Sequence, residues 1–195
     1  TQGYSSAASD VYKRQIQDSD HVPEIHYAKA EFTEEMKNDK DYTILVPEMS
    51  PIHFPIIQAA ARAAGYNVKV LSPVRADIDE GLASVNNDAC YPAIITIVSL
   101  MRALKSGEYD LNRTALMMSQ TGGMCRASNY IGFIHKALDE AGLSQIPVIS
   151  LNTQGFEPQP GFKFSLSLAT NLVQAVIYGD ALQQCLYRTR PYELT

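Results

Sequence analysis

The sequence predicts an α/β fold, with a doubly wound, mostly parallel open sheet in a Rossmann-like three-layer α/β/α arrangement. Short apolar segments typical of strands alternate along the chain with longer segments of helical periodicity. The strand segments lack a polar face, which is typical of parallel strands covered by helices on both sides. Hydrophobic residues make up 46% and charged residues 19% of the chain, so the composition suits a buried core.

Four short apolar segments are predicted to be the strands of this sheet. They are Tyr42–Val46, Asn67–Leu71, Thr114–Met118 and Pro147–Leu151. Pro47 follows the first of them and is expected to end it, because proline has no N–H to donate to a neighbouring strand.

Four segments with helical periodicity are predicted to be the covering helices. They are Phe54–Ala64, Cys90–Lys105, Met124–Ala141 and Phe164–Tyr187. A glycine follows closely after each of the first three, as expected at a helix end. Pro92 falls in the first turn of the second, where a missing N–H is harmless. Gly179 and Asp180 mark a candidate break in the last.

The chain is expected to divide into three parts. Residues 1–15 are polar, lack periodicity and resemble translated adapter sequence, so we expect a disordered or artefactual leader. Residues 16–40 form an outlying helical segment with a helix over Glu24–Asn38, and residues 41–195 form a single α/β domain. A further short helix is expected over Asp77–Val85. The suspected leader makes the chain an expected fragment of a longer protein.

Composition excludes several classes of protein. Lysine and arginine total 16 against 21 aspartates and glutamates, and the net charge of −5 argues against nucleic-acid binding. No apolar run reaches the roughly 18–20 residues that a membrane span needs, and no signal peptide is recognisable. Three cysteines are an odd number and too few for a disulfide framework. We therefore expect a cytoplasmic protein.

Two cysteines fall where a doubly wound sheet binds its ligands, beyond the carboxyl ends of the strands. Cys90 and Cys125 each lie at the predicted start of a helix, where the helix dipole favours the thiolate that binds iron or attacks a substrate. A shared site and two structural cysteines are both open interpretations. The separation of 35 residues, with no CxxC motif, excludes the common zinc-ribbon and ferredoxin patterns.

Further candidate residues lie at the same edge of the predicted sheet. Gly122 and Gly123 can offer backbone N–H groups to an anion, Arg126 can balance negative charge, and Asn87 precedes the Cys90 helix. His53 follows the first strand and is a candidate ligand, acid or base, although a structural role is as good an interpretation. No GxGxxG, P-loop or GxSxG motif is present.

Two other residues are given structural roles. His135 is expected to be solvated on its helix. Cys185 is expected in the core, because it continues a stripe on the last helix at a spacing of four residues. The other members of the stripe are Ala169, Val173, Ile177 and Ala181.

The cysteine-centred segments carry a resemblance to a known family. The runs NNDACYPA (86–93) and QTGGMCRASNY (120–130) resemble the 2-hydroxyacyl-CoA dehydratase family, most closely the C-terminal part of the large acyl-CoA dehydratase activase-related proteins. The runs over 46–54 and 178–193 are similar to that group as well. The likeness covers about residues 30–195, and its cysteine motifs are the specific part.

This resemblance implies an α/β domain that holds a [4Fe–4S] cluster through cysteines at helix starts. Cys90 and Cys125 would be ligands, and the cluster would pass an electron from an ATP-driven activator to a 2-hydroxyacyl-CoA. The implied partners are the rest of a longer chain or an ATP-dependent activase domain, and acyl-CoA. The dehydratases use a third cysteine, for which this sequence has no clear match; Cys185 would qualify only if the last helix turned it toward the crevice.

The residues leave other functions open. The chain can be a small-molecule or nucleotide-binding α/β module with structural cysteines, in which Gly122 and Gly123 cradle a phosphate. It can be a thiol enzyme with Cys125 as nucleophile and His53 as base. It can also be a non-catalytic subdomain that docks on the rest of a longer chain through an exposed apolar patch.

Overall fold

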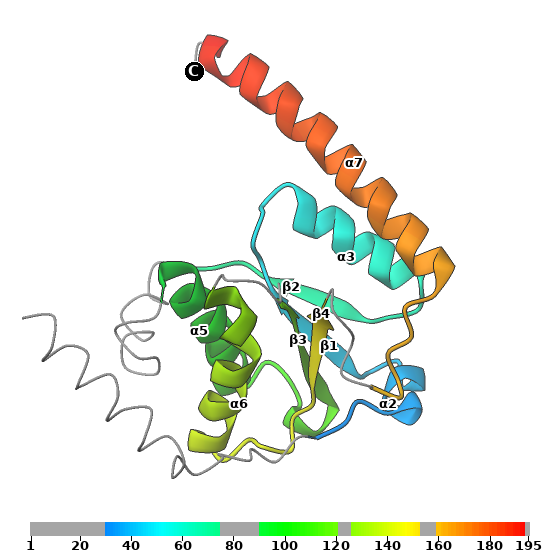
Figure 1. Cartoon of the computed structure of the whole chain (residues 1–195), viewed down its shortest axis with the longest axis vertical. Coiled ribbons are helices and arrows are strands. Elements are labelled where there is room, and N and C mark those ends of the chain that lie inside the picture. The colour runs from blue at the N-terminus through cyan, green and yellow to red at the C-terminus, as the bar shows by residue number, and fades with distance from the viewer. Residues whose placement is uncertain (1–29, 75–89, 121–125, 153–158, 194–195) are drawn as a thin grey trace, which may run out of the picture.

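A computed structural model describes residues 30–74, 90–120, 126–152 and 159–193 (Figure 1). Its sheet has four strands in the order β2-β1-β3-β4, and every neighbouring pair is parallel. The strands are β1 (Thr43–Pro47), β2 (Val68–Leu71), β3 (Thr114–Gln120) and β4 (Val148–Asn152). All four coincide with predicted strands to within two residues at either end.

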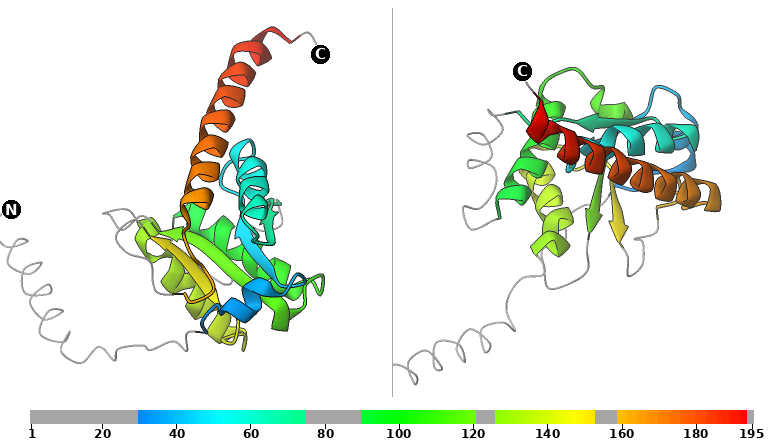
Figure 2. Two further views of the ribbon diagram at one scale, coloured as in Figure 1. Left: turned by 90° about the vertical axis from the view of Figure 1, so that its right-hand side faces the viewer. Right: turned by 90° about the horizontal axis from the view of Figure 1, so that it is seen from above.

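Helices cover both faces of the sheet, which confirms the predicted three-layer α/β fold. On one face lie α3 (His53–Ala63) and α7 (Leu166–Thr189), and on the other lie α5 (Tyr91–Lys105) and α6 (Tyr130–Glu140) (Figures 1 and 2). The short α2 (Glu34–Asn38) precedes β1.

The strand order creates a switch point between β1 and β3. From β1 the chain reaches β2 through α3 on one face, whereas the connections through α5 and α6 run on the other face and carry the chain to β3 and β4. In open parallel sheets, ligands bind where neighbouring connections diverge in this way, beyond the carboxyl ends of the strands. Here those ends lead into residues 48–52 after β1 and residues 121–125 after β3.

The core consists of two apolar clusters, one on each face of the sheet. Successive strand residues point to opposite faces, so Ile44 and Ala115 belong to the cluster under α7, whereas Leu45 and Leu116 belong to the cluster under α5 and α6. All four are at most 2% exposed. This double burial explains why the strand segments have no polar face.

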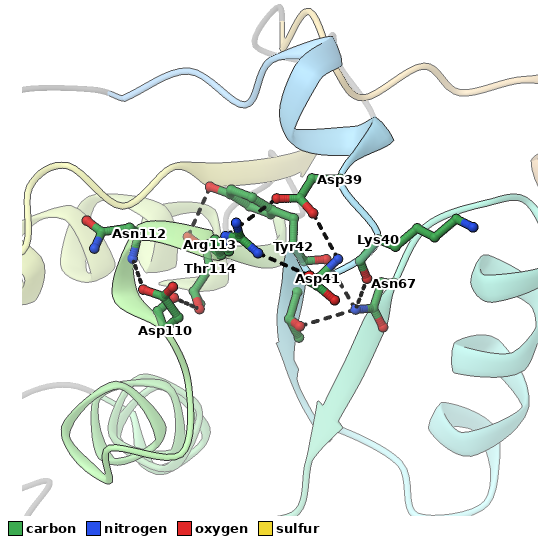
Figure 3. Close-up of polar contacts among 10 residues, drawn as sticks. Asp39, Lys40, Asp41, Tyr42, Asn67, Asp110, Asn112, Arg113 and Thr114 are labelled. Atoms are coloured by element: carbon green, nitrogen blue, oxygen red, sulfur yellow. Dashed lines mark hydrogen bonds and ion pairs between the residues drawn. The ribbon is translucent and has the colours of Figure 1, made fainter.

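Polar contacts fix the starts of the strands at the opposite edge of the sheet (Figure 3). Arg113 Nη1 lies 3.1 Å from Asp41 Oδ2, and the Tyr42 hydroxyl donates to the carbonyl of Thr114 at 3.2 Å. The Asn67 amide donates to the carbonyl of Tyr42 at 3.2 Å. Tyr42 is 5% exposed, and burial raises the pKa of its hydroxyl to about 12.

Two helix predictions are corrected in their boundaries. The described part of the segment predicted over Met124–Ala141 is a 3-10 turn, η3 (Arg126–Asn129), followed by α6. Within the segment predicted over Glu24–Asn38, residues 30–33 are not helical, because the Thr33 side chain caps α2 by accepting the N–H of Met36. The predicted helix over Asp77–Val85 and the predicted leader lie outside the described residues.

The candidate break at Gly179 does not occur, and α7 is continuous over 24 residues. Glycine is needed there for close packing instead. A Cβ at Gly179 would lie 2.4 Å from Cδ2 of His53, so the missing side chain lets the imidazole rest directly on α7.

Candidate functional site

Cys90 is the N-cap residue of α5, as the sequence predicted, and lies at the carboxyl edge of the sheet. Its carbonyl accepts the N–H groups of Ala93 and Ile94 at 2.9 and 3.2 Å. Its half-buried side chain does not cap the helix. The Sγ atom instead lies 3.2 Å from the hydroxyl of Tyr130. The thiol therefore faces the neighbouring helix α6.

Tyr130 connects Cys90 to the segment that carries the second candidate thiol. It is the first residue of α6, is 5% exposed, and follows Cys125 by five positions with only η3 between them. Sequence reasoning did not single out Tyr130, although a tyrosine at a helix start just after a cysteine-bearing loop was a usable signal. The contact brings Cys90 to the helix start that follows Cys125.

The other predicted ligands of this crevice are not placed. Asn87, Gly122, Gly123 and Cys125 lie outside the described residues, and of Arg126 only the backbone is described, as the first residue of η3. Among the residues that the structure describes, no three histidine, cysteine or acidic side chains gather as a metal site. At this crevice the described part therefore supplies one candidate thiolate ligand, Cys90.

One thiol does not make a cluster site, but its chemistry is that of an iron ligand. A thiolate is the form of cysteine that binds iron, and the partial positive charge of a helix N-terminus favours it. A phenolic hydroxyl can donate a hydrogen bond to a thiolate sulfur, and such bonds tune cluster potentials. Cys90 and Tyr130 together provide this pair.

Cys185 is exposed, so its predicted place in the core is wrong. The face of α7 that packs inward carries Leu168, Ala175 and Gly179, all buried, whereas Val173 and Ile177 of the predicted stripe are 58% and 64% exposed. Both stripes have small or apolar residues at helical spacing, and the buried one is the stripe that contains Leu168, Ala175 and Gly179, not the stripe that contains Cys185.

Cys185 is also not brought to the crevice. It lies near the C-terminal end of α7 (Leu166–Thr189), and the C-terminal part of this helix extends beyond α3 (Figures 1 and 2), whereas Cys90 begins a helix on the opposite face of the sheet. The described structure thus gives no support to Cys185 as the third ligand.

His53 forms a polar relay with two residues that the sequence did not pair with it. Its Nδ1 lies 2.9 Å from the hydroxyl of Ser50, in the loop after β1, and its Nε2 lies 3.0 Å from Oδ1 of Asp180 on α7. The His53 side chain is 13% exposed and that of Asp180 69%. If Nε2 carries the proton and donates to Asp180, then Nδ1 accepts from Ser50. These two contacts fix the ring and connect α7 to the loop after β1. The Ser-x-x-His spacing in the sequence could have indicated the Ser50 contact.

His135 is buried, at 6% exposure, so its predicted solvated position is wrong. It shares the inward face of α6 with Ile131, Ile134 and Leu138, at the three- and four-residue spacing of a helix face.

A cavity of about 310 Å³ lies between the sheet and the helices α3 and α7. Strand residues such as Val68 and Met117 form one side of it, and Ile57 and Leu172 lie on the helical side. Met49, Phe164 and Val176 line it and are 44–49% exposed, so the cavity is open to solvent.

Comparison with known proteins yields no matching family model and no match among curated proteins. Of the helices that the structure describes, none has the length and apolar character required to cross a membrane.

Proposed function

We propose that this chain is a [4Fe–4S]-binding α/β domain of the 2-hydroxyacyl-CoA dehydratase and activase-related group, acting in electron transfer to an acyl-CoA dehydration system in the cytoplasm. The observation that carries the proposal is the Cys90 thiol at a helix start. It lies 3.2 Å from Tyr130, the first residue of the helix that follows the Cys125 segment. Cys125 follows β3 in the sequence, and in this proposal its thiol shares the crevice with Cys90.

Each residue of the crevice has a proposed role. Cys90 and Cys125 bind iron as thiolates, and the backbone N–H groups of Gly122 and Gly123 stabilise the negative charge. Arg126 supplies a counter-charge, and Asn87 adds a polar group at the same edge. With Cys90 as a thiolate, the Tyr130 hydroxyl 3.2 Å away would donate a hydrogen bond to its sulfur. A bound cluster supplies one-electron chemistry.

The proposed partners follow from the same resemblance. The electron donor is an ATP-dependent activase domain or the rest of a longer chain, and the acceptor system uses acyl-CoA. Cys185 is exposed on α7 and is not assigned as the third ligand.

Anaerobic expression followed by reconstitution with iron and sulfide tests this proposal. We expect absorbance at about 400 nm, bound iron and bound sulfide in the native chain. Cys90→Ser and Cys125→Ser should each lose most of this signal, whereas the exposed-thiol control Cys185→Ser should retain it. Equal iron and sulfide contents in all four proteins would contradict the proposal.

A further inference from the structure

We infer that Ser50, His53 and Asp180 form a hydrolytic site, in which Ser50 attacks the carbonyl carbon of a small uncharged carboxylic ester. Hydrogen bonds join the three side chains in a row: Ser50 Oγ lies 2.9 Å from His53 Nδ1, and His53 Nε2 lies 3.0 Å from Asp180 Oδ1. A hydroxyl, an imidazole and a carboxylate in this order are the parts of an activated serine nucleophile. None of them belongs to the proposed cluster crevice, so the inference stands apart from the proposed function.

The hydrogen bonds give each ring nitrogen of His53 a role. An ionised carboxylate only accepts hydrogen bonds, so in the neutral ring Nε2 carries the proton and donates to Asp180. Nδ1 then has no proton and accepts from the Ser50 hydroxyl, which is the arrangement that a general base needs. Asp180 is a positioning residue, because it holds this tautomer and stabilises the imidazolium that forms when Nδ1 takes a proton.

Packing holds the imidazole in place before a substrate arrives. The His53 side chain is only 13% exposed. A Cβ at Gly179 would lie 2.4 Å from its Cδ2 atom, so this edge of the ring rests on the backbone of α7. Both ring nitrogens and one ring edge are therefore fixed. A base that its surroundings already orient loses little freedom in the reaction, which favours catalysis.

The start of α3 can stabilise the negative charge that develops on the ester oxygen. Among the described residues no acceptor pairs with the backbone N–H groups of Ile52 and His53, whereas the N–H of Phe54 donates to the carbonyl of Ser50 at 3.0 Å. The two N–H groups follow Ser50 by two and three residues, and a helix N-terminus attracts negative charge. Ser50 is half-buried and Pro51 is exposed, so a small ester can reach this loop.

The reaction has two balanced steps. The Ser50 oxygen bonds to the carbonyl carbon while its proton moves to His53 Nδ1; the bond to the alcohol then breaks, and the leaving alcohol takes the proton from Nδ1. Water next attacks the acyl group on Ser50 and gives a proton to Nδ1, and the acid leaves as this proton returns to the Ser50 oxygen. The exposed carboxylate of Asp180 beside the ring disfavours an anionic ester.

Hydrolysis of p-nitrophenyl acetate by the full chain, prepared without iron, tests the inference. We expect p-nitrophenolate to be released faster than by free imidazole at the same concentration. We also expect phenylmethylsulfonyl fluoride to modify Ser50, as located by peptide mass spectrometry. Ser50→Ala should lower kcat/KM by about 100-fold or more. The matched control is Ser72→Ala, which should keep the wild-type value, because Ser72 is an exposed serine directly after β2.

Two further variants separate catalysis from a structural role of the same contacts. His53→Ala should lose hydrolysis, and added imidazole should restore part of it, whereas imidazole should not restore Ser50→Ala. Asp180→Asn should lower kcat by about 10- to 100-fold and leave KM unchanged. This loss is smaller than the roughly 10⁴-fold loss expected at a buried aspartate, because Asp180 is 69% exposed and water can stabilise the imidazolium in its place.

The remaining outcomes are also decisive. A wild-type chain that is not modified at Ser50, or that hydrolyses the ester no faster than free imidazole, would show that the contacts are only structural and overturn the inference. A folded Ser50→Ala variant with an unchanged rate would overturn it too, as would loss of the rate in Cys185→Ser, which would assign hydrolysis to the exposed thiol. If Ser50→Ala unfolds, modification of the wild type decides. Iron content after reconstitution should be the same in Ser50→Ala and wild type, so failure here is distinguishable from failure of the cluster proposal.

Discussion

The Nε2 atom of His53 lies 3.0 Å from Oδ1 of Asp180, a contact that joins helix α3 to helix α7 across 127 residues of sequence. The same ring meets the Ser50 hydroxyl through Nδ1, at 2.9 Å. The two helices that cover the cavity are thus fastened to each other and to the loop after β1. Gly179 makes the contact possible, because its missing side chain leaves room for the ring.

Gly179→Ala should destabilise the protein although alanine is the better helix former. The new Cβ would lie 2.4 Å from Cδ2 of His53, whose ring is held at both nitrogens. We expect a loss of about 1–3 kcal/mol in the free energy of unfolding, measured by urea denaturation. In a His53→Ala background the clash is absent, so the same substitution should stabilise by about 0.5–1 kcal/mol. An unchanged sign in the two backgrounds would contradict the packing described.

Stability should fall at alkaline pH because of Tyr42. Burial raises the pKa of its hydroxyl to about 12 in the folded protein, whereas the pKa of tyrosine in an unfolded chain is about 10. Above pH 10 the unfolded state loses this proton first, so the stabilising effect is complete below pH 10 and disappears as the pH approaches 12. We expect a decrease of about 2–3 kcal/mol over that range in urea denaturation. Tyr42→Phe should flatten this part of the curve, and an equally steep curve would refute the assignment.

Gly161→Ala should be more harmful than an ordinary glycine substitution in a turn. A Cβ at Gly161 would lie 2.1 Å from the carbonyl oxygen of Thr33. The Gly161 N–H donates to the carbonyl oxygen of Phe32 at 2.7 Å, which holds the backbone in place. We expect a loss of about 3 kcal/mol, since backbone must move. At Gly142 no atom lies within 4 Å of the new Cβ, and only the positive φ of 69° opposes alanine. Gly142→Ala should therefore cost about 1 kcal/mol, and a reversed order of the two would count against this packing.

Cys185 should react with a thiol reagent in the native protein, because its side chain is exposed on α7. Ellman's reagent should modify it at a rate close to that of a small thiol, and the Cys185→Ser variant should lose one rapidly reacting equivalent. The same variant should change the free energy of unfolding by less than about 0.5 kcal/mol. Slow modification together with a large loss of stability would show instead that Cys185 is buried in the core, as the sequence predicted.

Tyr130→Phe should leave a reconstituted cluster in place but lower its reduction potential. The tyrosine hydroxyl lies 3.2 Å from the Cys90 sulfur, and donation to a sulfur stabilises the reduced, more negative cluster. Iron content should match that of the wild type, while a redox titration followed by absorbance should show a more negative midpoint. A matched control is Tyr109→Phe, since Tyr109 packs against the same core from the far end of α5. Equal midpoints in the two variants would argue against a Tyr130–sulfur bond.

The strands and most helix ends could be predicted because local signals determine them. Continuous apolar runs marked the four strands, and Gly65, Gly107 and Gly142 all have the positive φ expected after a helix. Cys90 could be placed at a helix start because Pro92 follows it by two residues, and proline is tolerated only in the first turn of a helix. These features depend on neighbours in sequence alone.

What could not be predicted depends on partners distant in sequence. The stripe containing Cys185 and the stripe containing Ala175 are both apolar, and only the packing of α7 on α3 decides which is buried. A glycine in the sequence can mark a helix break or a site of close packing, and the sequence near Gly179 does not tell the two apart. The deciding partner is the ring of His53, which is distant in sequence. The Cys90–Tyr130 contact likewise joins residues 40 positions apart.

The continuity of α7 through Gly179 has an effect on the way this helix melts. Its first turns pack on α3 and the sheet, whereas its C-terminal turns project away from the rest of the described chain (Figure 2), and Tyr187 is 64% exposed. A few unsupported turns are marginal in water, so they fray from the distal end inward. Amide hydrogen exchange should therefore decline step by step from the last turn toward the imidazole contact, giving one helix a gradient of lifetimes.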